Sequence, residues 1–218
     1  MEKGILVTGA TGLLGTEVIR HLIRQEKAPL FALVRGRHQA QALHRLKSFW
    51  CEEPELLRAL DDRIHVVCGD VTRESLGLTE EKAEKLAYQI GIVIHTAAET
   101  GVQRSREELL RINTEGTGNI LSFAKRAAEK GGFERFVLIS TAYVAGTRSG
   151  RILETDPLPD KYSTHYEESK AKAEILVRQA GLPYTICRPG MIIGNSKTGR
   201  TRNFNTIYYI LKLSTQGV

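Results

Sequence analysis

Near the amino end of the chain, a short apolar run is followed by Thr8-Gly9-Ala10-Thr11-Gly12-Leu13-Leu14-Gly15. Gly9 permits a tight turn out of a strand, Gly12 lets the backbone approach a pyrophosphate, and Gly15 lets helix and strand pack closely. The N–H groups at the start of the following helix can then bind phosphate. A glycine-rich turn that binds no ligand could have the same sequence. The position of this turn between a predicted strand and a predicted helix favours a dinucleotide-binding site. We expect the dinucleotide to contact Gly9, Thr11, Gly12, Leu13, Leu14 and Gly15.

Apolar runs and helical periodicity alternate along the rest of the chain. The apolar runs predict strands at Ile5–Thr8, Leu30–Val34, Ile64–Cys68, Ile92–His95, Phe136–Ser140 and Tyr184–Cys187. Helices are predicted at Leu13–Arg24, Gln39–Trp50, Glu55–Leu60, Glu80–Gln89, Arg106–Lys130, His165–Ala180 and Phe204–Leu213. The strands are continuously apolar, which is typical of strands buried on both faces. This order predicts an α/β protein with a doubly wound parallel sheet, the Rossmann fold.

Composition excludes several classes of protein. The three cysteines and six histidines show no metal-ligand spacing, so no metal site is predicted. The net charge of +6 is spread through the predicted helices, which disfavours nucleic acid and suits phosphate-bearing small molecules or an acidic carrier protein. No apolar run approaches the roughly 18 residues that span a bilayer, and the first strand follows the amino end too closely for a signal peptide. We therefore expect a cytoplasmic protein without a membrane span.

The second predicted strand ends with two arginines, Arg35 and Arg37. An acidic residue at this place suits the ribose 2′-hydroxyl of NAD, whereas arginine suits the 2′-phosphate of NADP. The two arginines favour NADPH, with NAD as the other possibility, although solvated arginines would look the same.

Further cofactor contacts are expected where the third and fourth strands end. Asp70-Val71 follows the third strand, and Asp70 either meets the adenine amino group or caps a turn. Thr96-Ala97-Ala98 follows the fourth strand, and small residues there would let a cofactor lie across the edge of the sheet.

A candidate catalytic set lies in the second half of the chain. Tyr166 and Lys170 are four residues apart, hence on one helix face, and a nearby ammonium is expected to lower the pKa of the tyrosine. Thr141, with Ser140 as the alternate, ends the fifth strand and can donate a hydrogen bond to a developing oxyanion. Asn113 either holds a water molecule that leads to Lys170 or is a polar residue that bends its helix. Tyr166 and Lys170 are also expected to contact the cofactor.

Together these motifs resemble the extended short-chain dehydrogenase/reductase superfamily, and within it the thioester-reductase or male-sterility branch, which includes fatty acyl-CoA reductases. Eight segments over about 180 residues carry the resemblance: Thr8–Gly15, Leu33–Arg35, Gly69–Val71 with Leu76–Leu78, His95–Ala98, Asn113–Thr117, Ser140–Gly146, Tyr166–Lys170 and Arg188–Gly190. It implies that Thr141, Tyr166 and Lys170 are catalytic. It also implies backbone contacts of Pro189 and Gly190 with the nicotinamide.

The resemblance implies two regions of unequal completeness. Residues 1–190 are expected to form the NAD(P)-binding Rossmann domain, and residues 191–218 the incomplete start of a C-terminal substrate-binding portion. Family members usually continue well beyond this point. Oligomeric state is left open between monomer and homodimer.

The function that the resemblance implies is NADPH-dependent reduction of an acyl thioester, carried by CoA or by an acyl carrier protein, to an aldehyde or alcohol. An alternative is an NAD-dependent nucleotide-sugar epimerase or dehydratase, or a ketoreductase, of the same superfamily. A second alternative is a dinucleotide-binding module without catalysis. The intact Thr141, Tyr166 and Lys170 set favours an enzyme, an NAD(P)-dependent oxidoreductase.

Overall fold

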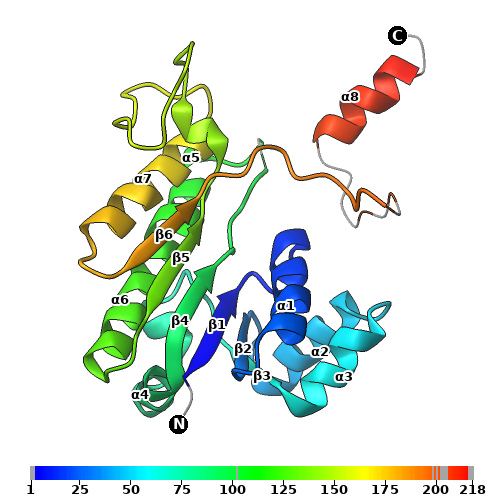
Figure 1. Cartoon of the computed structure of the whole chain (residues 1–218), viewed down its shortest axis with the longest axis vertical. Coiled ribbons are helices and arrows are strands. Elements are labelled where there is room, and N and C mark those ends of the chain that lie inside the picture. The colour runs from blue at the N-terminus through cyan, green and yellow to red at the C-terminus, as the bar shows by residue number, and fades with distance from the viewer. Residues whose placement is uncertain (1–2, 102, 198, 200, 202–205, 216–218) are drawn as a thin grey trace.

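One parallel sheet organises the molecule. The computed structural model describes residues 3–101, 103–197, 199, 201 and 206–215. Within these residues, six strands pair in parallel in the order β3-β2-β1-β4-β5-β6 (Figure 1). The strands are β1 (Gly4–Thr8), β2 (Leu30–Val34), β3 (Ile64–Cys68), β4 (Ile90–His95), β5 (Arg135–Ile139) and β6 (Tyr184–Cys187). The predicted doubly wound fold is confirmed, because the chain runs outward from β1 in both directions.

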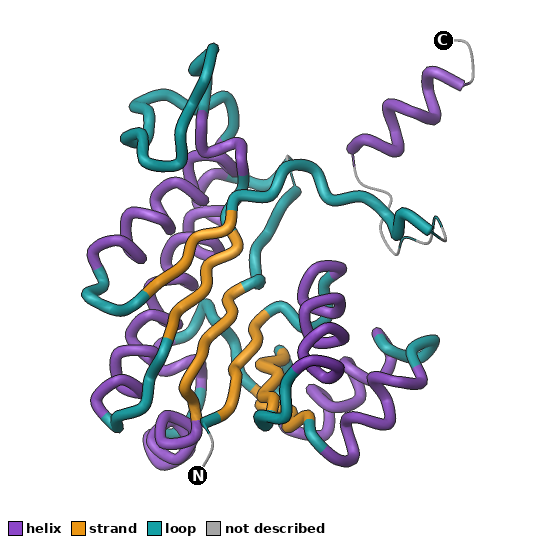
Figure 2. Tube along the Cα trace, in the orientation of Figure 1, coloured by secondary structure: helices purple, strands orange, loops and turns teal. Residues whose placement is uncertain are grey.

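Helices cover the two faces of the sheet. The helical elements are α1 (Leu13–Gln25), α2 (Gln39–Phe49), α3 (Pro54–Asp62), η1 (Glu74–Gly77), α4 (Glu80–Gln89), α5 (Arg106–Leu109), η2 (Leu110–Glu115), α6 (Gly116–Glu129), η3 (Ala142–Ala145), α7 (His165–Gln179) and α8 (Thr206–Thr215). In Figures 1 and 2, α1, α2 and α3 lie on one side of the strands, and α4, α6 and α7 lie on the other.

The core is correspondingly divided into two layers. Leu6 and Phe136 pack with residues of α4, α6 and α7, whereas Ile5 and Val7 pack with residues of α1, α2 and α3. Successive residues of a strand point to opposite faces, so β1 contributes to both layers, and all five of its residues are buried. Because apolar side chains pack against both faces of the sheet, the polar side chains of a functional site are expected at the edge where the strands end.

Two predicted helices differ from those observed. The stretch expected as one helix, Arg106–Lys130, contains the π-helical turn η2 between α5 and α6. The last helix was expected at Phe204–Leu213 and is found as α8, two residues later, with Phe204 outside the described residues. In Figure 1, α8 lies apart from the sheet, and the Tyr208 hydroxyl accepts a hydrogen bond from the Gly194 N–H at 2.7 Å.

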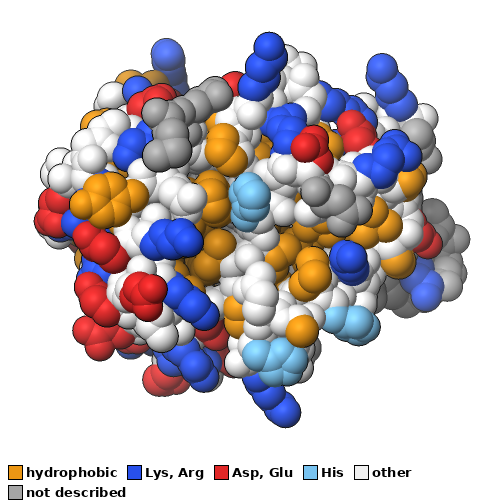
Figure 3. All heavy atoms as spheres, turned by 90° about the horizontal axis from the view of Figure 1, so that it is seen from below, with side chains coloured by type: hydrophobic (Ala, Val, Ile, Leu, Met, Phe, Trp, Pro, Cys, Tyr) orange, Lys and Arg blue, Asp and Glu red, His pale blue; other side chains and the backbone are white. Residues whose placement is uncertain are grey.

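The surface at the amino ends of the strands carries charges of both signs. Figure 3 views the molecule from this side and shows basic and acidic side chains interspersed around a central band of apolar ones. No helix among the described residues has the length and apolar character needed to cross a membrane.

Candidate active site

The glycine-rich turn between β1 and α1 has the geometry of a phosphate cradle. Gly9 adopts a φ of +74°, and its carbonyl accepts a hydrogen bond from the Gly12 N–H at 2.8 Å, which closes the turn. A Cβ on Gly15 would lie 2.2 Å from the Gly9 oxygen, so this position tolerates only glycine. A Cβ on Gly12 would meet only that oxygen, at 3.3 Å, which leaves open space above the turn. The turn thus leaves room where a phosphate group would lie.

The start of α1 offers hydrogen-bond donors to that space. Gly12 is the N-cap, no side chain caps the helix, and the first turn, which contains Leu13 and Leu14, has no acidic residue. A helix start with uncapped N–H groups and a positive dipole end binds anions. The pyrophosphate of a dinucleotide therefore fits these residues in both space and charge.

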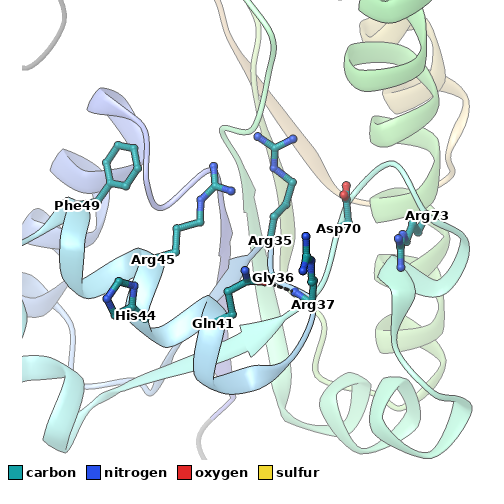
Figure 4. A pocket seen from close by; sticks show the side chains of 9 residues that line it. All are labelled: Arg35, Gly36, Arg37, Gln41, His44, Arg45, Phe49, Asp70 and Arg73. Carbon is teal, nitrogen blue, oxygen red and sulfur yellow. Dashed lines mark hydrogen bonds between the residues drawn. The ribbon is translucent and has the colours of Figure 1, made fainter.

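A basic pocket lies beside the end of β2. It has a volume of about 640 Å³, and Figure 4 shows Arg35 and Arg45 extending in the same direction on either side of it. It is lined by Arg35, Gly36, Arg37, Gln41, His44, Arg45, Phe49, Asp70 and Arg73. Four guanidinium groups and one carboxylate give it a strongly positive balance, which suits a phosphate monoester. Sequence reasoning identified Arg35 and Arg37 but missed Arg45 and Arg73, which come from α2 and from the turn after β3.

Asp70 performs the turn-capping role that the sequence left open. Its Oδ1 accepts hydrogen bonds from the Thr72 N–H and from the Thr72 hydroxyl, both at 2.9 Å. The same residue lines the basic pocket, so an adenine contact stays a prediction. Val71 is buried, and its carbonyl accepts a hydrogen bond from Asn119 Nδ2 at 2.8 Å.

The carboxyl ends of β1 and β4 are joined by side chains. The Thr96 hydroxyl donates to the Thr8 carbonyl at 2.7 Å, and the Ala97 N–H donates to Thr8 Oγ1 at 3.2 Å. A Cβ on Gly9 would lie 2.5 Å from Thr96 Oγ1, so this segment packs directly on the glycine turn. Ala98 is exposed beyond it. The predicted cofactor residues of β1 and β4 are thus brought together at one edge.

A buried histidine, His95, lies beneath this edge and contacts threonines of β1 and α6. Thr8 Oγ1 lies 2.7 Å from His95 Nδ1, and His95 Nε2 lies 3.2 Å from Thr117 Oγ1. Because the Thr117 hydroxyl donates its hydrogen to the Asn113 carbonyl, it can only accept from Nε2, so the ring proton is on Nε2 and Nδ1 accepts from the Thr8 hydroxyl. Burial lowers the pKa of His95 to about 3, with a smaller contribution from Lys170, so the ring is neutral.

Asn113 lies in the π-helical turn η2 and connects two parts of the site. Its Oδ1 accepts from the Glu99 N–H at 2.8 Å, and its Nδ2 donates to the Glu99 carbonyl and to Ser169 Oγ, both at 2.9 Å. The Asn113 carbonyl accepts from the Thr117 hydroxyl at 2.6 Å. These contacts favour the interpretation of Asn113 as a polar residue of an irregular helix. A water molecule leading to Lys170 stays a prediction.

The start of α7 fixes the orientation of the tyrosine. The Thr164 hydroxyl accepts from the Glu167 N–H at 3.2 Å, and the Glu167 carboxylate accepts from the Ser163 N–H at 2.8 Å. Thr164 is thus the N-cap, and α7 begins at His165, one residue before Tyr166. Tyr166 is therefore on the first turn of α7.

Thr141, Tyr166 and Lys170 meet at the carboxyl edge of the sheet. The Thr141 hydroxyl acts on the Tyr166 hydroxyl and lowers its pKa, which places the two groups close together. Lys170 is only 2% exposed and donates from Nζ to the Ile139 carbonyl at 2.7 Å. Burial lowers the pKa of Lys170 to about 8, against a smaller raising effect of Glu174. Three groups that can donate protons or hydrogen bonds thus converge where β5 ends.

The expected lowering of the Tyr166 pKa by Lys170 was wrong in direction. Burial raises the pKa of Tyr166, and the nearby Thr141 hydroxyl lowers it only in part. The Lys170 ammonium is engaged with the Ile139 carbonyl, and a phenol out of water resists ionisation. Tyr166 consequently keeps its proton at neutral pH.

Pro189 and Gly190 lie next to this group. The Pro189 carbonyl accepts from the Ala142 N–H at 2.9 Å, which places the segment after β6 beside Thr141. Gly190 is exposed. Sequence reasoning missed Glu174, which is fully buried two turns after Tyr166, although its i+8 spacing could have indicated it.

The comparison with known proteins agrees with this geometry. A family model described as "Male sterility protein" matches residues 7–218. The chain belongs to this family. The resemblance inferred from the motifs, to the male-sterility branch of the extended short-chain dehydrogenase/reductases, is thereby confirmed.

Relatives in this male-sterility family are reductases. Fatty acyl-CoA reductase 2, chloroplastic, of Arabidopsis thaliana is 29% identical over 86% of this chain and 32% of its own length. L-2-aminoadipate reductase of Schizosaccharomyces pombe is 33% identical over 90% of this chain and 15% of its own length. The crystal structure of the terminal R domain from the myxalamid PKS-NRPS biosynthetic pathway superimposes with a TM-score of 0.88 at 32% identity, covering 97% of this chain and 55% of that one. The chain spans less than a third of these two curated relatives.

Proposed function

We propose that this male-sterility family chain is the cofactor-binding and catalytic part of an NADPH-dependent reductase of acyl thioesters, with CoA or an acyl carrier protein as the carrier. The observation that carries the proposal is the convergence of Thr141 and Tyr166 with Lys170, which is buried one turn further along α7 and donates to the Ile139 carbonyl at the end of β5. Residues 1–190 would be the Rossmann domain, and residues 191–218 would begin the substrate-binding portion. The cytoplasmic location and the choice between monomer and homodimer stay predictions.

NADPH is the cofactor that the basic pocket favours. The pocket offers Arg35 and Arg37 from the end of β2, together with Arg45 and Arg73. A ribose 2′-phosphate carries about two negative charges, which bidentate guanidinium groups neutralise, whereas a 2′-hydroxyl calls for a carboxylate. The uncapped start of α1 would hold the pyrophosphate.

The residues of the site suit a carbonyl reduction. When bound, NADPH supplies a hydride to the carbonyl carbon of the thioester. Tyr166 and Thr141 donate hydrogen bonds to the carbonyl oxygen and stabilise the charge that develops on it. The raised pKa of Tyr166 keeps its proton available for donation at neutral pH. Lys170, whose pKa burial lowers to about 8, would bind the ribose hydroxyls through its ammonium group.

Loss of the thiol completes the first reduction. The tetrahedral adduct breaks its carbon–sulfur bond, the sulfur leaves with the bonding electrons as a thiolate, and an aldehyde is left. A second NADPH, bound after NADP⁺ has left, would supply the hydride for the aldehyde, and Tyr166 would deliver a proton to its oxygen to give the alcohol. The same three residues therefore serve both steps.

Replacing Tyr166→Phe tests the proposal. With acyl-CoA and acyl-carrier substrates, we expect thioester-dependent NADPH oxidation, followed by absorbance, to fall by a factor of about 10² or more. The matched control is Tyr88→Phe, an exposed tyrosine on α4 that is remote from the site. Turnover by Tyr166→Phe at the wild-type rate would refute the role of this residue. Activity on nucleotide sugars in place of thioesters would instead favour the epimerase alternative.

A further inference from the structure

Glu174 is a fully buried carboxylate on the catalytic helix. It lies four residues after Lys170 and eight after Tyr166, so the three side chains share one face of α7. Its exposed fraction is 0%, although acidic side chains are almost never fully buried without a partner. Removing a carboxylate from water costs free energy, so its burial calls for a compensating interaction.

Arg188 is the partner of Glu174. Its Nε donates to Glu174 Oε1 at 3.0 Å and its Nη2 to Oε2 at 2.7 Å, which makes a bidentate pair. Arg178 approaches Oε2 at 3.5 Å. Although burial raises the pKa of Glu174, the hydrogen bonds from Arg188 lower it overall, so the carboxylate is ionised.

The Glu174–Arg188 pair links α7 to the end of β6, and backbone hydrogen bonds link β6 to the end of β5. Glu174 is on α7, and Arg188 directly follows β6 and precedes Pro189. The ends of β5 and β6 are linked by the Ser140 N–H, which donates to the Cys187 carbonyl at 2.7 Å, and by the Ala142 N–H, which donates to the Pro189 carbonyl at 2.9 Å. A change in the pair would therefore shift α7 against the strand ends.

We propose that the Glu174–Arg188 pair positions Lys170 relative to Thr141 and to the Pro189–Gly190 backbone. This inference rests on the proposed function, because it assumes that Lys170 takes part in the reaction. Glu174 and Arg188 are positioning residues in this scheme, since they act through Lys170 and through the backbone that follows β6.

An ion pair is better suited to this task than an apolar contact. A buried ion pair contributes little net stability compared with apolar residues of similar size, but two parallel hydrogen bonds fix both distance and angle. The charge of Glu174 also opposes the effect of burial on the Lys170 pKa. The other charged or titratable groups that act on these two residues are Arg178 on α7, His95 on β4 and Tyr162 in the loop before α7.

A second bidentate pair on the same helix provides the control. Arg106 donates to Glu168 from Nε at 2.8 Å and from Nη2 at 2.5 Å. The Glu168 side chain is 19% exposed and also pairs with Lys172, on the side of α7 that faces α5. Glu168→Gln thus repeats the chemistry of Glu174→Gln away from Lys170.

The test compares Glu174→Gln, Glu168→Gln and Lys170→Met in the intact protein. For Glu174→Gln we expect kcat to fall between about tenfold and a hundredfold, because small misplacements of catalytic groups cost that much. The Kd for NADPH, measured by its fluorescence, should change less than about threefold, because most of the proposed cofactor contacts are made by the glycine turn and the basic pocket, away from the pair. The alkaline limb of the kcat profile should move to lower pH, because Lys170 loses the carboxylate that holds its proton. Glu168→Gln should keep kcat within about twofold of wild type.

A double variant separates positioning from stability. Glu174→Gln with Arg188→Gln leaves no unpaired buried charge, so its Tm should recover relative to Glu174→Gln alone. Its kcat should stay low, because the bidentate geometry is not restored. Wild-type kcat and pH profile in either variant would overturn the inference. Wild-type activity of Lys170→Met would instead overturn the proposed function.

Discussion

Two regions share the carboxyl edge of the sheet, the proposed cofactor-binding region beside β1 and β2 and the proposed catalytic region beside β4, β5 and β6. The first is made of backbone and of exposed charge: the turn at Gly9–Gly15 and the arginines that follow β2. Most of it comes from one continuous stretch, residues 8–45. The second is made of buried side chains from separate elements, such as Asn113, Thr141 and Lys170.

This difference determines which properties of the protein a substitution in each region is expected to change. In the first region, we expect cofactor binding to depend on steric limits at one or two glycines and on the charge of the arginines. In the second, each polar side chain holds another element in place, as Asn113 holds Glu99 and Ser169. Substitutions there are expected to couple stability, pH dependence and activity.

The largest effect is expected at Gly15. Gly15→Ala places a Cβ 2.2 Å from the Gly9 oxygen, and overpacking of this kind costs about 1–3 kcal/mol. Because backbone must move, we also expect NADPH binding, followed by fluorescence, to be lost. The control is Gly118→Ala in α6, where the nearest atom is 3.8 Å away and alanine should stabilise by about 0.5–1 kcal/mol in urea unfolding. A Gly15→Ala chain that binds NADPH normally would contradict the steric argument.

The next effect concerns the choice of cofactor at Arg35. Arg35→Gln should weaken NADPH binding by about tenfold or more and leave NADH binding nearly unchanged, since a charge-assisted hydrogen bond contributes about 1.5–3 kcal/mol. Competitive titration with both reduced cofactors measures the ratio. Arg58→Gln on α3, also an exposed arginine, serves as the control. Equal losses for both cofactors would remove the basis for NADPH selection at this position.

A smaller effect is expected from the buried histidine. The unfolded chain protonates His95 below about pH 6.5, whereas the folded chain resists protonation down to about pH 3, so stability falls as the pH falls through this window. Between pH 6.5 and pH 5 the loss should be about 2 kcal/mol. Urea unfolding of His95→Gln should lack this slope, and His21→Gln, at an exposed position, should keep it. If His95→Gln retained this dependence of stability on pH, the effect would belong to another titratable group.

The smallest effect is expected at the half-exposed pair of α7. Arg106 and Lys172 lower the pKa of Glu168 to about 2, so its contribution is present above pH 4.5 and is lost as the pH falls towards 2. Glu168→Gln should therefore cost at most about 1 kcal/mol at pH 7 and almost nothing near pH 2. The measurement is the difference in urea unfolding between wild type and variant at the two pH values. A cost of several kcal/mol at neutral pH would mean that this pair is no milder than the one at Glu174.

The sequence predicted the glycine turn and the arginines of the first region because their determinants are local, and their contacts with a cofactor stay predictions. A positive φ at Gly9, the tight contact at Gly15 and an arginine at the end of β2 are properties of neighbouring residues. The strands were also predictable, since burial on both faces produces continuous apolar runs. Arg45 was missed because its position on α2 relative to Arg35 depends on how that helix packs.

The catalytic region was predicted as a set of residues but not as an arrangement. The i and i+4 spacing of Tyr166 and Lys170 indicated a shared helix face, yet the direction of the Tyr166 pKa shift was wrong because burial outweighs charge there. Asn113 was recognised as a residue that could bend its helix, but the π-helical turn itself was not predicted, because the Asn113 side chain bonds with Glu99 and Ser169, which are distant in the chain.

By itself, the sequence determined the strand and helix order, the glycine turn and the candidate catalytic residue types, because these follow from periodicity and from local steric limits. Only the tertiary structure decided which groups are buried and with whom: His95 between Thr8 and Thr117, and Glu174 with Arg188. The physical reason is that desolvation and hydrogen bonding depend on residues far apart in the chain, which meet only when the strands end at one edge.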